Sequence, residues 1–128
     1  MTLNEATKYW QDSSEKDRLV ALDLFKTGHF TWCLFLWQLT IEKLLKARIA
    51  SEGEDIPYTH NLSKLAKAGG LVPDAENVEK LLEITSFNLE TRYDDFKQSF
   101  YRKANRDYTE KWQTICQELY LWIKNQIS

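Results

Sequence analysis

The sequence predicts an all-α protein, a bundle of four long antiparallel helices plus one short helix. Three observations predict it. Hydrophobic residues recur with a 3.6-residue period along almost the whole chain. Only four glycines and two prolines are present, which leaves few of the tight turns that a strand-rich fold needs. Charged residues make up 28% and hydrophobic residues 43% of the chain, a mixture typical of a folded globular protein rather than a disordered one.

Length and charge limit the classes of function. A chain of 128 residues has the usual size of one domain, so we expect a single helical domain over residues 1–128. Seventeen basic and nineteen acidic side chains give a net charge of −2, so nucleic acid would need a local basic patch. The chain starts without an apolar signal segment and has no run of about 18 apolar residues. We therefore expect a cytoplasmic protein with no membrane partner.

The first helix is expected to begin near Leu3, because Thr2 and Glu5 have the spacing of a capping box. Its apolar stripe has a polar break at residues 12–17. Gly28 then supplies a left-handed stop that ends the helix.

The second helix is expected over residues 30–51, with Gly53 after its end. Its first half, FTWCLFLW, is apolar nearly all round, which is typical of a central helix packed on several sides. Cys33 in this stretch and Cys116 in the last helix both lie in apolar helical patterns. We interpret them as buried thiols in a reducing compartment rather than as a disulfide.

Two helices follow an acidic loop. A short helix is expected over residues 62–68, capped by Thr59 or Asn61 and terminated by two glycines. Pro73 and Asp74 then begin another helix with a clear apolar face.

The hydrophobic period is lost after Leu89, so the sequence predicts a connection without regular structure over residues 90–106. The period returns at Asp107, which with Glu110 supplies a cap pattern for the last helix. That helix has the most regular apolar spacing in the chain and continues to Ile127.

The segment RYDDFKQSFYRKANR, residues 92–106, has the most unusual composition. From Lys97 to Arg106 it holds four cations and no acid, interleaved with two aromatic residues. Cations neutralise phosphates and aromatic faces stack with bases, a combination that single-stranded nucleic acid or nucleotide binding requires. A solvated connection between helices with a few anchoring aromatics would have the same composition.

The second helix carries polar residues beside its apolar face. Gln38, Glu42 and Lys46 are four residues apart and are therefore neighbours on the helix surface. One interpretation is a solvent-facing stripe with a weak ion pair. The other is an anion site to which Lys43 and Lys46 contribute, with Glu42 holding one of them in place. The predicted nucleotide- or RNA-binding residues are Lys43, Lys46, Arg92, Tyr93, Arg102, Lys103 and Arg106.

No catalytic residue, metal site or cofactor is predicted. The sequence contains no GxxxxGK, GxGxxG, GxSxG or HExxH motif. Two well-separated histidines and two apolar cysteines do not make a conventional zinc site. We interpret His29 as a helix-end residue and His60 as a capping or loop residue that, like Glu42, can contribute to a site. The adjacent acids Asp94 and Asp95 are more typical of a turn than of acid–base chemistry.

The stretch FTWCLFLWQLTIEKLLKARI, followed after a loop by YTHNLSKLAKAGG, resembles the HEPN domain family (higher eukaryote and prokaryote nucleotide-binding). The family pattern is a Gln-x-x-x-Glu-Lys-x-x-Lys helix, then a loop and a His-x-Leu entering a short helix. Those places are taken here by Gln38, Glu42, Lys43, Lys46, His60 and Leu62. Arg92 and Tyr93 match the Arg-Tyr-Pro segment before the last helix, with Asp94 in place of the proline.

The resemblance implies a small helical bundle, commonly a homodimer, and often a minimal nucleotidyltransferase as partner in a toxin–antitoxin-type pair. Some members are metal-independent ribonucleases with an Arg-x(4–6)-His motif at the dimer interface. This chain lacks that motif. We therefore expect a non-catalytic, dimeric nucleotide- or RNA-binding module. Trp32, Phe35 and Trp37 are predicted to contact the second copy, unless they fill the core.

Two alternatives remain open. A divergent ribonuclease would use Arg92 or Arg102 to stabilise negative charge on phosphate, and His60 or Tyr93 to transfer protons. A helical bundle that binds only proteins would show an exposed apolar patch and no affinity for nucleic acid.

Overall fold

The computed structural model describes residues 1–89 and 94–127, except the side chains of 94–96. Within these ranges the chain forms six α-helices and no β-strand, which confirms the all-α prediction. The long helices are α1 (Leu3–Lys26), α2 (Phe30–Ser51) and α6 (Arg106–Asn125). The shorter ones are α3 (Leu62–Ala68), α4 (Ala75–Thr85) and α5 (Asp94–Lys103). No helix in the described ranges is long and apolar enough to cross a membrane.

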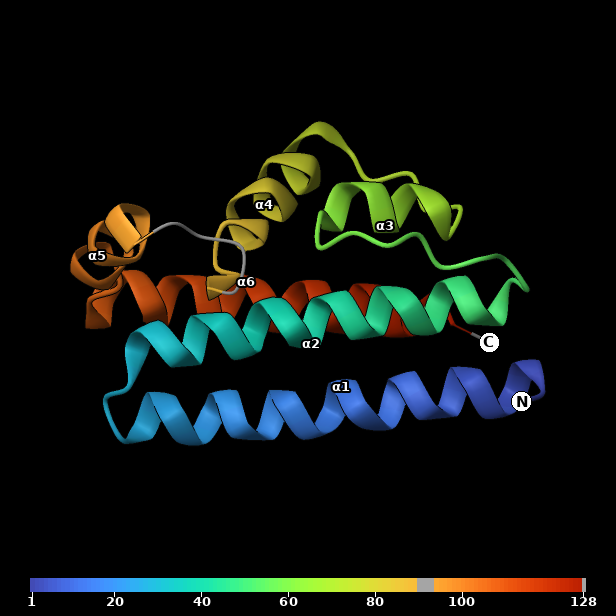
Figure 1. Ribbon diagram of the computed structural model, residues 1–128, viewed down its shortest axis with the longest axis horizontal. Helices are drawn as coiled ribbons and strands as arrows, with labels where there is room; N and C mark the ends of the chain where they lie inside the picture. Colours follow the sequence, from blue (N-terminus) through green and yellow to red (C-terminus); the bar gives the residue numbers. More distant parts are fainter. Residues whose placement is uncertain (90–93, 128) are drawn as a thin grey trace.

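The three long helices lie side by side along the length of the molecule, and α3, α4 and α5 lie on the side of α2 that is turned away from α1 (Figure 1). α1 runs antiparallel to its two long neighbours. α2 and α6 run in the same direction, since Trp37 bonds to Gln113 and Arg48 bonds to Gln126. The sequence predicts four long antiparallel helices, whereas the described chain has three long helices, two of which are parallel.

α1 begins at the predicted capping box, where the backbone N–H of Glu5 donates to Thr2 Oγ1 at 3.1 Å. The polar break at residues 12–17 does not interrupt the helix. Its side chains bond to neighbouring helices instead: Ser14 is fully buried, and its hydroxyl donates to the backbone oxygen of Thr40 at 2.7 Å. The break is therefore a place where α1 is attached to α2.

The turn between α1 and α2 also follows the prediction. Gly28 has a φ of 80°, in the left-handed region that costs other residues about 1–2 kcal/mol. The rings of Phe25 and Phe30 on either side of the turn are 5.6 Å apart. His29 occupies the N-cap position of α2, as expected for a helix-end residue, although its side chain makes no capping bond.

α2 is the central helix, and it buries most of its circumference. Trp37 is fully buried, and its indole N–H donates to Gln113 Oε1 at 2.9 Å. Phe35 is also buried. The prediction that these two residues contact a second copy is therefore wrong, because they pack inside this chain. Trp32, the third residue predicted to contact a second copy, lies at the surface and is 47% exposed.

Both cysteines are buried and unbonded to each other, as predicted. Burial raises the pKa of the Cys33 thiol to about 12 and raises that of Cys116 as well. Both are therefore protonated thiols at neutral pH, which suits small apolar core residues rather than nucleophiles.

Of the two residues predicted to cap α3, the structure shows Asn61 in that position, and α4 begins after Pro73 and Asp74 as predicted. The Asn61 side chain accepts from the Lys64 N–H at 3.1 Å, and the Asp74 side chain accepts from the Asn77 N–H at 2.8 Å. Each side chain thereby satisfies a backbone N–H group in the first turn of its helix, where no partner is available within the helix.

The segment after Leu89 differs from the prediction. It contains α5, which buries Phe100 against Phe87 with ring centroids 5.6 Å apart. The cap of α6 is Asn105, whose side chain accepts from the N–H of Tyr108 at 2.9 Å, so α6 begins earlier than the predicted start at Asp107. A helix of ten residues is too short to leave a long periodic pattern in the sequence.

Candidate functional site

A buried carboxylate, Glu42, lies at the centre of a polar network on α2. Its side chain is 4% exposed. Gln38 Nε2 donates to Oε1 at 3.0 Å, Lys46 Nζ donates to Oε2 at 3.1 Å, and His60 Nδ1 lies 2.8 Å from Oε1. Gln38 in turn accepts from Asn88 Nδ2 at 3.0 Å. The network therefore joins α2 to the loop before α3 and to the segment after α4.

The donors around Glu42 decide its charge. Burial by itself raises the pKa of a carboxyl group, because the charged form loses its hydration. Hydrogen bonds from Gln38, His60 and Lys46, together with the charge of Lys46, outweigh this and hold the pKa of Glu42 below its ordinary value. Glu42 is a carboxylate at neutral pH. Because it is buried, the interpretation of these residues as a solvent-facing stripe is wrong.

The two lysines of α2 lie in separate ion pairs. Lys43 Nζ is 2.7 Å from Asp17 Oδ2 on α1, while Lys46 is held by Glu42, as predicted for one of the two. Lys46 also lies 5.0 Å from the centre of the Trp10 ring. Each ammonium group is therefore neutralised by a carboxylate of its own within the chain. Their contribution to an anion site stays a prediction.

His60 is oriented by the buried carboxylate. Because Glu42 can only accept, Nδ1 of His60 must carry the hydrogen, which leaves Nε2 as the nitrogen that can accept or transfer a proton. The His60 side chain is 41% exposed. A carboxylate behind a surface imidazole is suited to acid–base chemistry. Within the described part of the chain, no arginine bonds to either residue.

The two arginines at the α5–α6 junction are an exposed part of the predicted site. Arg102 and Arg106 are exposed, and neither forms an ion pair with a carboxylate among the described residues. The guanidinium carbon of Arg106 lies 5.6 Å from the centre of the Phe25 ring. By contrast, Arg18 and Arg48 are each paired with a glutamate three or four residues away.

The other predicted residues of this segment have different environments. Lys103 Nζ lies 3.1 Å from Glu83 Oε2 and 5.2 Å from the centre of the Tyr108 ring, so it ties α5 to α4 and α6. Arg92 and Tyr93 lie outside the described residues. The structure thus leaves Arg102 and Arg106 as the cations of the predicted set without a carboxylate partner in the described chain.

The two groups of cations are far apart. Phe30, the first residue of α2, contacts Phe25 and thereby lies at the same end as Arg106. Lys46 is more than four helical turns further along α2, about 24 Å at 1.5 Å per residue. α5 and the start of α6 lie with the α1–α2 turn at one end of the molecule (Figure 1). Lys46 and Arg106 therefore do not line one groove.

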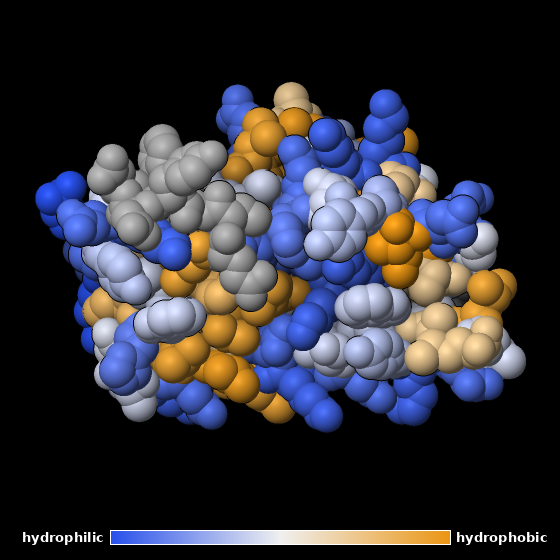
Figure 2. Space-filling view, viewed as in Figure 1, coloured by the Kyte–Doolittle hydropathy of each residue, from blue (hydrophilic) through white to orange (hydrophobic). Residues whose placement is uncertain are grey.

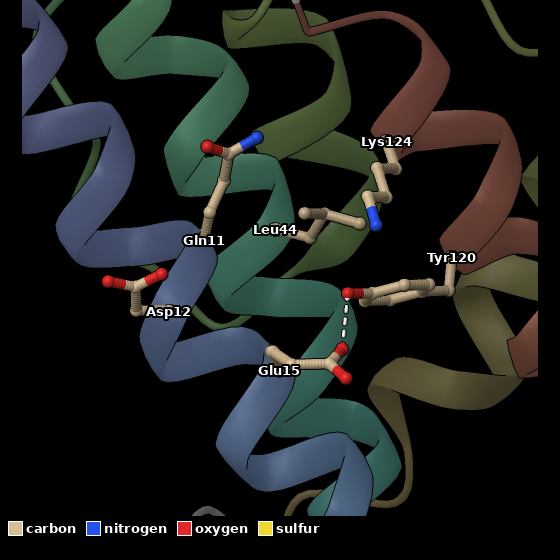
Figure 3. A pocket seen from close by; sticks show the side chains of 6 residues that line it. All are labelled: Gln11, Asp12, Glu15, Leu44, Tyr120 and Lys124. Atoms are coloured by element: carbon tan, nitrogen blue, oxygen red, sulfur yellow. Dashed lines mark hydrogen bonds between the residues drawn. The ribbon is translucent and has the colours of Figure 1, made fainter.

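A cleft of about 250 Å³ between α1, α2 and α6 was not predicted. Its lining consists of Gln11, Asp12, Glu15, Leu44, Tyr120 and Lys124 (Figure 3). The Tyr120 hydroxyl donates to Glu15 at 2.6 Å across the cleft, and Arg18 donates to both Glu15 oxygens at 2.8 and 2.7 Å. In the sequence, Glu15 and Arg18 have only the spacing of an ordinary surface ion pair.

The charges in this cleft hold α1 to α6. The hydrogen bond from Arg18 lowers the pKa of Glu15 to about 2, against the opposing effect of partial burial, and Tyr120 adds to the lowering. Burial, reinforced by Glu15, raises the pKa of Tyr120 to about 12. A carboxylate and a phenol therefore face each other throughout the physiological range, and the pair acts as a structural contact.

Comparison with known proteins identifies the architecture. The sequence model of the HEPN domain matches residues 7–126. The fold is similar to that in the crystal structure of TT1696 from Thermus thermophilus, with a TM-score of 0.76 over 94% of this chain and 97% of that one. The two sequences are 18% identical, so this likeness concerns the fold alone. A comparison with curated proteins finds no match.

We expect Glu42→Gln to lower the free energy of unfolding by about 3 kcal/mol, because it leaves the mostly buried Lys46 without its counter-ion. Urea unfolding at pH 7 measures the loss. Glu76→Gln is the matched control, since it removes an ion pair with Lys80 of the same spacing in which the glutamate is 77% exposed. Its expected loss is about 0.3 kcal/mol. Equal losses in the two variants would contradict the role given to the network.

A second prediction concerns pH. The folded pKa of Glu15, about 2, lies below its ordinary value of 4.5, so its contribution to stability is present above pH 4.5 and is lost as pH falls toward 2. Because Glu15 is 41% exposed, we expect Glu15→Gln to cost only about 1 kcal/mol at pH 7. Urea unfolding should show this difference shrinking below pH 4.5.

The control for this prediction is Asp23→Asn, which changes an exposed carboxylate that has no ion pair in the described chain. We expect it to have little effect on stability at pH 7. A loss for Glu15→Gln that stayed constant down to pH 2 would contradict the assignment of the lowered pKa to the Arg18 and Tyr120 contacts.

Proposed function

The chain belongs to the HEPN domain family, and on that premise we propose that it is a nucleotide- or RNA-binding module. Membership of the family relates the chain to nucleotides and RNA in general. The observation that carries the proposal for this chain is the exposure of Arg102 and Arg106 without a carboxylate partner among the described residues.

The surroundings of these arginines suit a phosphate chain with bases. A guanidinium presents a planar fork of donors that matches phosphate oxygens. Tyr101, next to Arg102, is 50% exposed, and Trp32, two residues into α2 at the same end of the molecule, is 47% exposed. Exposed rings beside cations offer faces for base stacking. This supports single-stranded RNA as the ligand class.

The remaining predicted cations are less suited to phosphate. Lys43, Lys46 and Lys103 each have a carboxylate partner that a phosphate would have to displace. Arg92 and Tyr93 stay predictions, because they lie outside the described residues. We therefore assign the phosphate contacts to Arg102 and Arg106.

We also propose that the module is a homodimer. Figure 2 shows hydrophobic side chains gathered over the first half of α2 and the part of α1 beside it. The Phe25–Phe30 and Asp17–Lys43 contacts bound this surface along the two helices. Between them, α1 carries Val20, which is 44% exposed. The stretch of α2 between the same contacts carries several partly exposed hydrophobic residues. A contiguous apolar surface of this kind favours a protein partner. A minimal nucleotidyltransferase in a toxin–antitoxin-type pair is the further partner that the family resemblance implies.

A ribonuclease is the second candidate function, and the 2.8 Å contact between His60 Nδ1 and Glu42 favours it. His60 Nε2 would take or give the proton, with Glu42 holding the ring in one orientation. The component that this mechanism still needs is an arginine beside the histidine, since no described arginine bonds to it.

The RNA proposal predicts that Arg102→Glu with Arg106→Glu weakens binding of labelled single-stranded RNA at least tenfold. It also predicts that the slope of log affinity against log salt concentration becomes less steep by about 1.4, because two phosphate contacts are lost. Fluorescence anisotropy across a salt series measures both. Lys64→Glu with Lys67→Glu, two exposed lysines of α3, gives the same change of net charge and should bind nearly as wild type.

Equal binding by the two double variants would contradict the assignment to the α5–α6 junction. The same reactions, run on a gel, separate the second candidate from the first. Cleavage that His60→Ala abolishes would support the ribonuclease, whereas a shift without cleavage supports the binding module.

The dimer proposal predicts that Val20→Lys raises the dimer dissociation constant about tenfold. The substitution removes an apolar side chain from the interface, and burying that side chain contributes about 1.5 kcal/mol to association. Sedimentation velocity over a range of protein concentrations measures the constant. Val72→Lys is the control, since Val72 is 91% exposed in the loop before α4. A wild-type chain that stays monomeric at all concentrations would refute the dimer.

A further inference from the structure

A groove runs between α4 and α6. Two hollows of about 200 and 550 Å³ lie between the two helices, and a third of about 550 Å³, lined by α6 alone, continues from them toward the start of α6. All three are lined by Ile115, and Lys80 and Lys111 each line two of them, so the hollows are continuous. Along α6 the groove extends from Asp107 to Trp122, about four helical turns or 22 Å.

The floor of this α4–α6 groove is apolar. It is formed by Trp112, Ile115, Leu119 and Trp122, which lie three or four residues apart on one face of α6. Leu119 and Trp112 belong to the hydrophobic core, and Ile115 and Trp122 are partly buried against it. The floor is therefore a rigid apolar surface that is joined to the core.

The rims of the groove are acidic. Four lining carboxylates have no ion pair within the described chain: Glu79, Asp107, Glu110 and Glu118. The other two, Glu76 and Glu83, are paired with lysines at 3.1 Å. Of the lysines that line the groove, Lys111 has no carboxylate partner within the described chain. The groove thus has an excess of negative charge that the described chain itself does not neutralise.

We propose that the α4–α6 groove docks a basic amphipathic helix of a partner protein. An apolar floor about three turns long, from Trp112 to Trp122, fits the apolar side of a helix of about 11 residues, in the helix-in-groove mode of recognition. Unpaired carboxylates on both rims select lysine and arginine on the flanks of that helix. They also repel phosphates, so this surface is distinct from the arginines at the α5–α6 junction and does not depend on RNA binding.

The probe for this proposal is a fluorescein-labelled 18-residue peptide of leucine and lysine, with leucines at helix positions i, i+3, i+4 and i+7. Its control has the same composition in an order that forms no apolar face. Fluorescence anisotropy with the full chain should show saturable binding of the first peptide at least tenfold tighter than that of the second. Equal binding of the two peptides would overturn the proposal, because it would reflect charge alone.

A triple variant tests the rims. Glu79→Lys, Glu110→Lys and Glu118→Lys together should weaken binding of the amphipathic peptide at least tenfold. The matched control is Asp23→Lys, Glu54→Lys and Asp55→Lys, three exposed acids outside the groove with the same total change of charge, and it should lose less than threefold. Equal losses in the two triple variants would overturn the assignment to the groove.

The location is tested by amide NMR shifts of the wild-type chain on addition of the peptide. The proposal requires the shifts to centre on residues 76–83 and 107–122. Shifts confined to α1 and α2 would overturn it. The proposal would also be overturned if the triple groove variant stayed monomeric at concentrations at which the wild-type chain forms dimers. The occupant of the groove would then be a second copy of this chain.

Discussion

The buried carboxylate of Glu42 has to find hydrogen-bond donors inside the protein, and the arrangement of the helices around α2 depends on that requirement. An unpaired buried charge costs several kcal/mol, so a fold that buries it must deliver donors from other segments. Gln38 and Lys46 come from the same helix, one turn before and one turn after. His60 comes from the loop before α3, and Asn88 reaches the network through Gln38. This network therefore also holds the loop before α3 and the segment after α4 against α2.

The attachment of α1 follows the same principle. An all-round apolar helix such as α2 can accept a neighbour at several angles and registers, because the hydrophobic effect is not directional. Directional contacts remove this freedom. Ser14 bonds to the backbone of Thr40, and Asp17 pairs with Lys43, so both contacts fix α1 against α2. Glu15, on another side of the helix, bonds to α6. The polar break in the α1 stripe is thus the part of α1 that sets its position.

How much of this could be predicted depends on how local the physics is. Caps and turns follow from neighbouring residues, so those of Asn61, Asp74 and Gly28 were predictable. α5 was not, because the contacts that hold its described part, Phe100 on Phe87 and Lys103 on Glu83, join it to residues distant in the sequence. The parallel course of α2 and α6 is a long-range property. The same holds for the site: spacing shows that Glu42 and Lys46 are neighbours, but their burial depends on Trp10 and His60, which come from distant segments.

A net charge of −2 conceals two surfaces of opposite sign. The exposed arginines lie at the α5–α6 junction, while the unpaired carboxylates of α4 and α6 line the groove that begins one residue later, at Asp107. The acids confine the basic surface to a short stretch, so one copy of the chain offers few phosphate contacts. Affinity for a phosphate chain rises with the number of phosphates neutralised. Under the proposed function, a second copy that doubles the arginines is therefore the physical route from a weak anion patch to an RNA-binding surface.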